Sequence, residues 1–171
     1  GSAVTLFAQW TLDTYTITYN LDSGTNDPGN PASYTVLTPT ITLQPATKAG
    51  YTFGGWYADA GFTTPVTQIV LGSTGNVTLY AKFTAVYPVT YNGNGSTGGS
   101  APVDALSPYA AGATVTVLGA GSLVRTGYTF VDWDMASDGS GANYDPADTF
   151  PMPGSAVTLF AQWTLDTYTI T

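Results

Sequence analysis

Residues 1–18 and residues 154–171 carry the same eighteen letters, GSAVTLFAQWTLDTYTIT. Identity over that length does not arise by chance. It sets a period of 153 residues, because residue 154 is the second copy of residue 1. A fixed period identifies a repeat architecture before any fold is considered. We therefore expect the chain to be one window of a tandem array.

A second, weaker period lies inside the first. Its recurring blocks are TYTITYN and VYPVTYN, GYTFGGWY and GYTFVDWD, and VTLYAKFT and VTLFAQWT. The intervals between the blocks differ in length, which predicts that the blocks are scaffold and the intervals are loops. The expected organisation is two related modules with a strand from each neighbour: residues 1–12 as the closing strand of a preceding repeat, 15–85 and 87–165 as the modules, and 168–171 as the opening strand of the next repeat.

The blocks predict strands. In the first copy of the last block, Val4, Leu6, Ala8 and Trp10 alternate with Thr5, Phe7 and Gln9. Alternation with a period of two is typical of a half-buried strand. The same pattern predicts strands at 15–21, 77–83, 87–91 and 157–163, and Thr and Val indicate further strands at 34–43 and 113–118. The GYTF blocks add one strand each, and residues 22–31 and 92–102 are rich in turn formers. No segment predicts a helix of ten residues, so the expected fold class is all-β.

Composition excludes several classes of function. The net charge is −8, with three basic residues against 11 Asp. Nucleic acid and anionic lipid both need a basic surface, so neither is an expected partner. No run approaches the roughly 20 apolar residues that span a bilayer, so no membrane insertion is expected in this window. An acidic surface with few Lys indicates an extracellular or cell-surface location.

The residues used most often in catalysis are missing. The sequence contains no His, no Cys and no Glu, so the usual general bases, thiol nucleophiles and metal-ligand sets cannot be assembled. Hydrolysis would have to rest on paired Asp alone. We expect a protein that is not an enzyme and has no cofactor, with calcium as the one exception to weigh.

The same blocks carry a family resemblance. GYTF followed by Gly55, Trp56 and Tyr57, with VTLYAKF further on, resembles the Listeria–Bacteroides repeat, also called the internalin B-type B repeat. The second module, with its long ASDGSGANYDP segment, is similar to a common variant of that repeat. It departs from the family pattern where Asp132 and Asp134 replace the usual Gly and Tyr around Trp133. The resemblance covers essentially the whole chain. It implies small β-grasp-like sheets strung in tandem on large surface proteins of bacteria or archaea, where such repeats serve as stalks, spacers or adhesive modules.

Short links between the blocks favour a stalk. Phe83 and Tyr87 are separated by three residues, and Trp10 and Tyr15 by four. Short links between folded units restrict their relative rotation, so repeat chains behave as quasi-one-dimensional rods. The sequence therefore predicts a stiff stalk, spacer or filament that packs head-to-tail with neighbouring repeats. The alternative function is an adhesin module that binds a glycan or a host protein.

Calcium is the only metal that the sequence suggests. Asp134, Asp138, Asn143 and Asp145 lie in an acidic segment with oxygen ligands near the spacing of calcium loops. A tight turn whose Asp carboxylates bond their own backbone explains the same letters. Both interpretations stay open, and no bidentate Glu completes an EF-hand.

Three further features concern surfaces. Asn76 and Asn94 match the N-glycosylation sequon, as chance also produces in a chain rich in Ser and Thr. The tryptophans could stack on a glycan, although Trp10 and Trp163 fall on the inward face of a strand, which favours packing. Finally, residues 1–12 form an apolar strand that either pairs with a preceding unit or adds to another copy of the chain.

Overall fold

A computed structural model describes residues 1–169 of the chain; residues 170 and 171, in the predicted opening strand 168–171, lie outside the described part. Every regular element in residues 1–169 is a β-strand and none is a helix, which confirms the all-β fold class. Accordingly, those residues offer no helix of the length and apolarity that crossing a bilayer requires. The chain divides into two compact units, Gly1–Thr84 and Ala85–Thr171.

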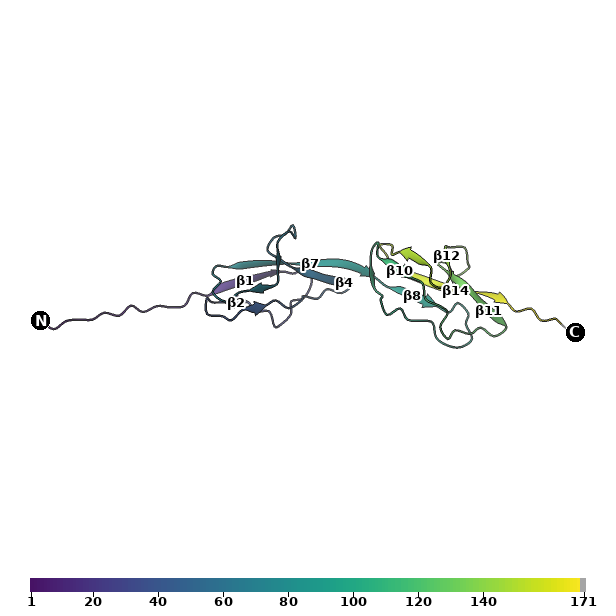
Figure 1. The fold of residues 1–171 in the computed structure, drawn as a ribbon, viewed down its shortest axis with the longest axis horizontal. Coiled ribbons are helices and arrows are strands. Elements are labelled where there is room, and N and C mark those ends of the chain that lie inside the picture. The colour runs from purple at the N-terminus through teal and green to yellow at the C-terminus, as the bar shows by residue number, and fades with distance from the viewer. Residues whose placement is uncertain (170–171) are drawn as a thin grey trace. The chain divides into compact units, whose positions relative to one another are not determined.

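The first unit is built on a parallel pair of strands (Figure 1). β1 (Tyr15–Asn20) pairs with β7 (Val77–Tyr87), the first and last strands of the unit. The sheet order is β2-β1-β7-β4-β5, and β3 pairs separately with β6. The remaining bounds are β2 Ser33–Tyr34, β3 Ile41–Thr42, β4 Tyr51–Tyr57, β5 Pro65–Val66 and β6 Gln68–Ile69.

The second unit repeats this arrangement. β8 (Val89–Asn92) lies parallel to β14 (Val157–Leu165), and β11 (Tyr128–Asp134) lies antiparallel on the other side of β14. β12 (Asn143–Tyr144) completes the order β12-β11-β14-β8, while β10 (Thr114–Thr116) pairs with β13 (Thr149–Pro151). β9 (Tyr109–Ala110) pairs with the last two residues of β7, which belong to this unit. The comparison of each unit with a β-grasp sheet stays an expectation.

An equivalent aromatic cluster fills each core. In the second unit Trp133 meets Tyr91 at 4.8 Å and Phe130 at 5.2 Å between ring centroids. In the first unit the same positions hold Trp56, Tyr19 and Phe53, at 5.2 and 5.4 Å. Both tryptophans are almost fully buried. Aromatic packing of this edge-to-face kind adds to the burial of the rings themselves.

Trp133 reaches the core through a β-bulge. Strict alternation would place Trp133 on the face opposite Phe130, since three positions separate them. The pairing of β11 with β14 shifts register between these two residues, so both rings turn to the same side. In the first unit Gly55 takes a φ of 117° at the corresponding position, a conformation that glycine adopts without strain.

One predicted strand is wrong in its extent. Residues 34–43 were expected to form a single strand, but the chain pairs only at β2 and β3 and turns between them. The turn is closed by Thr38, whose N–H donates to the Thr35 carbonyl at 3.0 Å, and Pro39 follows directly. Thr and Val predicted the two ends of the segment, and the proline interrupts it because it cannot donate to a ladder.

Residues 1–14 form no strand and are drawn as a coil (Figure 1). Their apolar side chains are exposed, with Leu6 at 89% and Trp10 at 90%. The copy at 154–165 forms β14 and buries Leu159 completely, which confirms the inward face expected from the alternation. The assignment of residues 1–12 to a preceding repeat stays a prediction.

Candidate functional site

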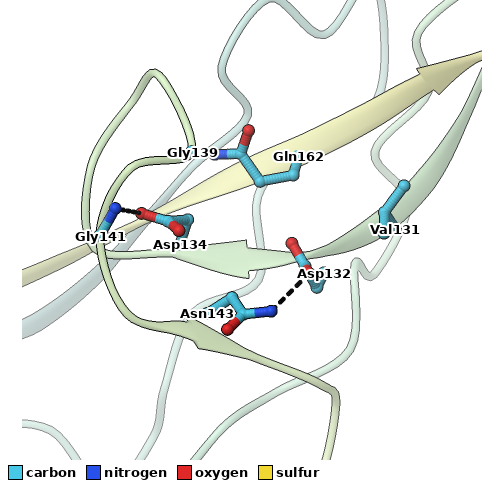
Figure 2. Close-up of a pocket in the computed structure, with 7 residues that line it drawn as sticks. All are labelled: Val131, Asp132, Asp134, Gly139, Gly141, Asn143 and Gln162. Atoms are coloured by element: carbon cyan, nitrogen blue, oxygen red, sulfur yellow. Dashed lines mark hydrogen bonds between the residues drawn. The ribbon is translucent and has the colours of Figure 1, made fainter.

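The acidic segment of the second unit folds around one buried carboxylate. Asp134 ends β11 and is 2% exposed. Its Oδ1 accepts hydrogen bonds from the backbone N–H groups of Ala136 at 2.6 Å and Gly141 at 3.0 Å. A Cβ at Gly141 would lie 2.5 Å from that oxygen, so glycine lets the loop close over it (Figure 2). The carboxylate therefore acts as the anchor of the loop at 135–142.

A shallow pocket of about 390 Å³ lies beside this anchor. Its polar walls are Asp132, Asp134, Asn143 and Gln162 (Figure 2). The Asn143 amide donates to Oδ2 of Asp132 at 3.3 Å, while Oδ1 of Asp132 is buried without a partner. The Gln162 amide donates to the carbonyls of Ala136 and Phe160, each at 3.3 Å. The ionisable side chains that line the pocket are the carboxylates of Asp132 and Asp134.

The four predicted calcium ligands are not gathered on one centre. Asp138 lies exposed in the loop, where its Oδ1 accepts from the Ser140 hydroxyl at 2.7 Å and from the Ser140 N–H at 3.1 Å. These bonds, the hydroxyl first, lower the pKa of the Asp138 carboxyl. Asp145 follows β12, and its N–H donates to Asp148 at 2.9 Å. Within residues 1–169 no group of three or more acidic side chains is placed to hold a metal ion. Calcium binding stays a prediction.

The two sequon asparagines have different environments. Asn76 is exposed before β7, and its Oδ1 accepts from the Thr16 N–H at 2.9 Å. The Asn94 amide nitrogen donates twice, to the carbonyls of Ser137 at 2.8 Å and Ala161 at 2.9 Å. That nitrogen is the atom that a glycan would occupy. In the folded second unit Asn94 therefore ties its loop to β14.

Three of the four tryptophans donate their indole N–H to a backbone carbonyl of their own unit. The indole N–H of Trp133 donates to the Leu118 carbonyl and that of Trp56 to the Gln44 carbonyl, each at 2.8 Å. Trp163 is half-buried and donates to the Gly93 carbonyl at 3.0 Å. Of the four tryptophans, Trp10 alone is exposed in this chain. The rings of Trp56 and Trp133 are buried and so are not accessible for stacking on a sugar.

Sequence reasoning missed a buried pair at the start of the second unit. Asp104 and Tyr109 are 8% and 9% exposed, and the phenol donates to the carboxylate at 2.7 Å. Burial, followed by the bond to Asp104, raises the pKa of Tyr109 to about 12. The sequence gives no periodic signal for Asp104, which lies in a segment without strands.

The cations are also held by aromatic rings. The Lys48 ammonium lies 4.3 Å from the centroid of the Tyr51 ring, and it forms an ion pair with Asp22 at 2.8 Å. The Arg125 guanidinium lies 4.0 Å from the Tyr128 ring. Such contacts stabilise a cation at the surface by about 0.5–1 kcal/mol.

Two stretches, residues 15–82 and 87–162, match the family model described as the Listeria-Bacteroides repeat domain. A protein of Evansella cellulosilytica, provisionally named a membrane protein, is 36% identical over 164 residues, which make up 92% of this chain and 23% of that protein. Internalin H of Listeria monocytogenes is 38% identical over 84 residues, or 47% of this chain and 14% of that protein. The chain thus spans less than a quarter of either relative. No solved structure matches it significantly.

Proposed function

The chain belongs to the Listeria-Bacteroides repeat domain family, and we propose that it is a structural segment of a cell-surface or membrane-associated protein, in which its units act as a stiff stalk or spacer. The names of the relatives support the location, since one is an internalin and another carries the name of a membrane protein. The period of 153 residues supports a tandem array.

The observation that carries the proposal is the absence of a linker between the units. The boundary between Thr84 and Ala85 falls inside β7, a strand of eleven residues. Leu79 and Ala81 of this strand lie in the core of the first unit, and Tyr87 pairs with Tyr109 in the second. A flexible Gly/Ser linker would allow free rotation. A strand that continues through this position favours restricted rotation.

A purely structural role also agrees with the chemistry of the site. One carboxylate oxygen of Asp134 accepts hydrogen bonds from two backbone N–H groups, and the Gln162 amide donates hydrogen bonds to two carbonyls. We propose that this segment shapes a loop and performs no catalysis. The expected partners are neighbouring repeats, and the net charge of −8 disfavours nucleic acid.

Stiffness can be measured between two spin labels. Cysteines at Thr18 and Thr116, both exposed and one in each unit, give two unique labelling sites because the chain has no cysteine. A four-residue Gly/Ser insertion between Thr84 and Ala85 should broaden the distance distribution at least about twofold, since it supplies a flexible linker. The same insertion between Gly154 and Ser155 is the control and should leave the width unchanged. A parent chain as broad as the Thr84 insertion variant would refute the stiff spacer.

An adhesin module is the alternative function. A surface aromatic pair, the half-buried Tyr57 and the exposed Phe62, supports it, with ring centroids 5.5 Å apart and the Lys82 ammonium near both rings. Surface aromatic side chains of this kind are enriched at binding sites. Glycan-array binding that is lost in Phe62→Ala and kept in Trp10→Ala would favour the adhesin. Absence of any glycan signal for the parent chain would count against glycan binding.

A further inference from the structure

The two units carry opposite chemistry at one equivalent position. Lys82 lies on β7 of the first unit, and Gln162 holds the same place on β14 of the second. Tyr57 at the end of β4 corresponds in the same way to Asp134 at the end of β11. The surface that these strands form therefore carries an ammonium group in the first unit and a carboxylate in the second.

The loops that follow β4 and β11 support this equivalence. The Phe62 N–H donates to the Asp59 carbonyl at 3.1 Å. The Gly139 N–H donates in the same way to the Ala136 carbonyl, also at 3.1 Å. Both donors have left-handed backbone, with a φ of 55° for Phe62 and 75° for Gly139. This conformation suits glycine and is strained for a bulky side chain. The first unit therefore places an aromatic ring where the second unit has no side chain.

Two aromatic rings hold the Lys82 ammonium at the surface of the first unit. It lies 5.8 Å from the centroid of the Phe62 ring and 5.5 Å from that of the Tyr57 ring. In residues 1–169 the ion pair with a carboxylate is that of Lys48, so neither Lys82 nor Arg125 has one. Arg125 lies closer to its own aromatic ring, at 4.0 Å. Lys82 is thus the basic residue that is held least tightly inside its unit.

The acidic counterpart is the pocket of about 390 Å³ in the second unit (Figure 2). Oδ1 of Asp132 is buried there without a donor. The 3.3 Å bond from Asn143 to Oδ2 of Asp132 is long, so a small rotation of this carboxylate turns an oxygen toward an incoming donor. Asp134 is 2% exposed, and its hydrogen bonds within residues 1–169 are made by Oδ1, which leaves Oδ2 without a donor.

Buried carboxylate oxygens are costly unless donors satisfy them. A lysine ammonium brings three donors and no acceptor, and its hydrogen bonds to carboxylates are stronger than those between neutral groups. Gly139 adds no side chain to the wall of the pocket. The pocket is therefore complementary to an ammonium group in both charge and hydrogen bonding.

We propose that this pocket takes the Lys82 ammonium of another copy of the chain, so that the first unit of one copy binds the second unit of the next. Charge complementarity selects this occupant, because Asp132 and Asp134 supply the acceptors that Lys82 lacks in its own unit. The contact joins two different surfaces, so it is heterologous and continues from copy to copy. It is small, and small interfaces are weak. This inference concerns the association of copies and does not depend on the spacer role.

Lys82→Gln tests the contact in the full chain. It gives the first unit the residue that the second unit already carries at this position. Sedimentation equilibrium should show the parent mass rising above 17.7 kDa with concentration. Lys82→Gln, and Asp132→Asn on the other side, should each lower the association constant at least about tenfold, as truncation of one partner of a charge pair does. Arg125→Gln changes the net charge equally and should leave the constant unchanged. A parent that stays at 17.7 kDa, or equal effects of Lys82→Gln and Arg125→Gln, would overturn the proposal.

Mixing the two variants gives a readout that misfolding would not produce. The Lys82→Gln chain keeps the pocket, and the Asp132→Asn chain keeps the lysine, so the mixture retains one native contact. Each variant alone should remain at the mass of one chain. The equimolar mixture should form complexes of two chains and stop there, because neither chain offers a second matching surface. A mixture no heavier than its separate components would contradict the proposed contact.

Discussion

The phenol of Tyr109 donates a 2.7 Å hydrogen bond to Oδ2 of Asp104, and both side chains are buried in the second unit. Tyr34, at the same place in the first unit, donates instead to the Gly75 carbonyl at 2.6 Å. The two units therefore satisfy one buried phenol with different acceptors. The charged acceptor occurs in the second unit.

This difference predicts an alkaline dependence of stability. The folded pKa of Tyr109, about 12, exceeds the ordinary value of 10.0. Its contribution to stability is therefore complete below pH of about 10 and is lost as the pH rises from about 10 to about 12. In urea unfolding followed between these values, Tyr109→Phe should lose stability less steeply than the parent. A slope equal to that of the parent would contradict the assignment, and Tyr34→Phe serves as the comparison in the first unit.

Closure of the loop at 135–142 predicts a strong requirement for glycine. In Gly141→Ala the new Cβ would lie 2.5 Å from Oδ1 of Asp134 and 2.8 Å from the Ala136 nitrogen. Overpacking of this kind costs about 1–3 kcal/mol. The control Gly154→Ala meets nothing within 4 Å and should be neutral. Chemical denaturation measures both, and equal midpoints would show that the loop adapts.

The indole bonds predict different costs for the tryptophans. Trp133→Phe and Trp56→Phe each leave a carbonyl without its donor and a gap in the core, with a combined cost of about 2–4 kcal/mol. Trp10→Phe should cost nothing measurable, because Trp10 is 90% exposed. Thermal unfolding of the three variants orders these effects. A loss for Trp10→Phe comparable to that for Trp133→Phe would count against the exposed state of residues 1–12.

The amide of Asn94 predicts both a stability effect and resistance to modification. Asn94→Asp keeps the size of the side chain and removes both donated hydrogen bonds, so we expect the second unit to lose about 1–3 kcal/mol. In a host that glycosylates folded proteins, Asn76 should carry glycan more often than Asn94, as intact-mass analysis would show. Preferential modification of Asn94 would mean that its loop opens readily.

Calcium should leave thermal stability unchanged if the turn interpretation is right. A ligand that binds the folded state raises stability in proportion to ln(1 + [L]/Kd), but Oδ1 of Asp134 is already occupied by two backbone N–H groups. The measurement is the unfolding temperature with millimolar calcium and with a chelator. A rise with calcium that Asp134→Asn abolishes would establish the metal site instead.

Local pattern was sufficient for most of the strands. Alternation identified the faces of β1, β7 and β14, because side chains of a strand must point to opposite sides. The same rule predicts that Trp56 and Trp133 lie on the face opposite Phe53 and Phe130. In the structure the rings of each pair pack against each other instead. A bulge is defined by the register of two paired strands, which the residues of one strand do not reveal.

The acidic segment shows a similar division. Gly, Asn and Asp indicated a turn with oxygen atoms, and those letters suit a calcium loop and a self-capped turn equally well. Asp134 differs from Asp138 because β11 carries it into the core, where it caps the returning loop at Gly141. Which carboxylate is buried depends on the path of the neighbouring strands.

The two identical segments, residues 1–12 and 154–165, show most clearly what the sequence alone does not determine. The sequence by itself determined the period, the strand propensity and the face on which Leu6 and Leu159 lie, since these follow from identity and from alternation. Only the tertiary structure decided that Leu159 is buried and Leu6 is exposed. The physical reason is that a strand has hydrogen-bonding partners and a core only where other strands flank it, and in residues 1–169 β8 and β11 flank the second copy.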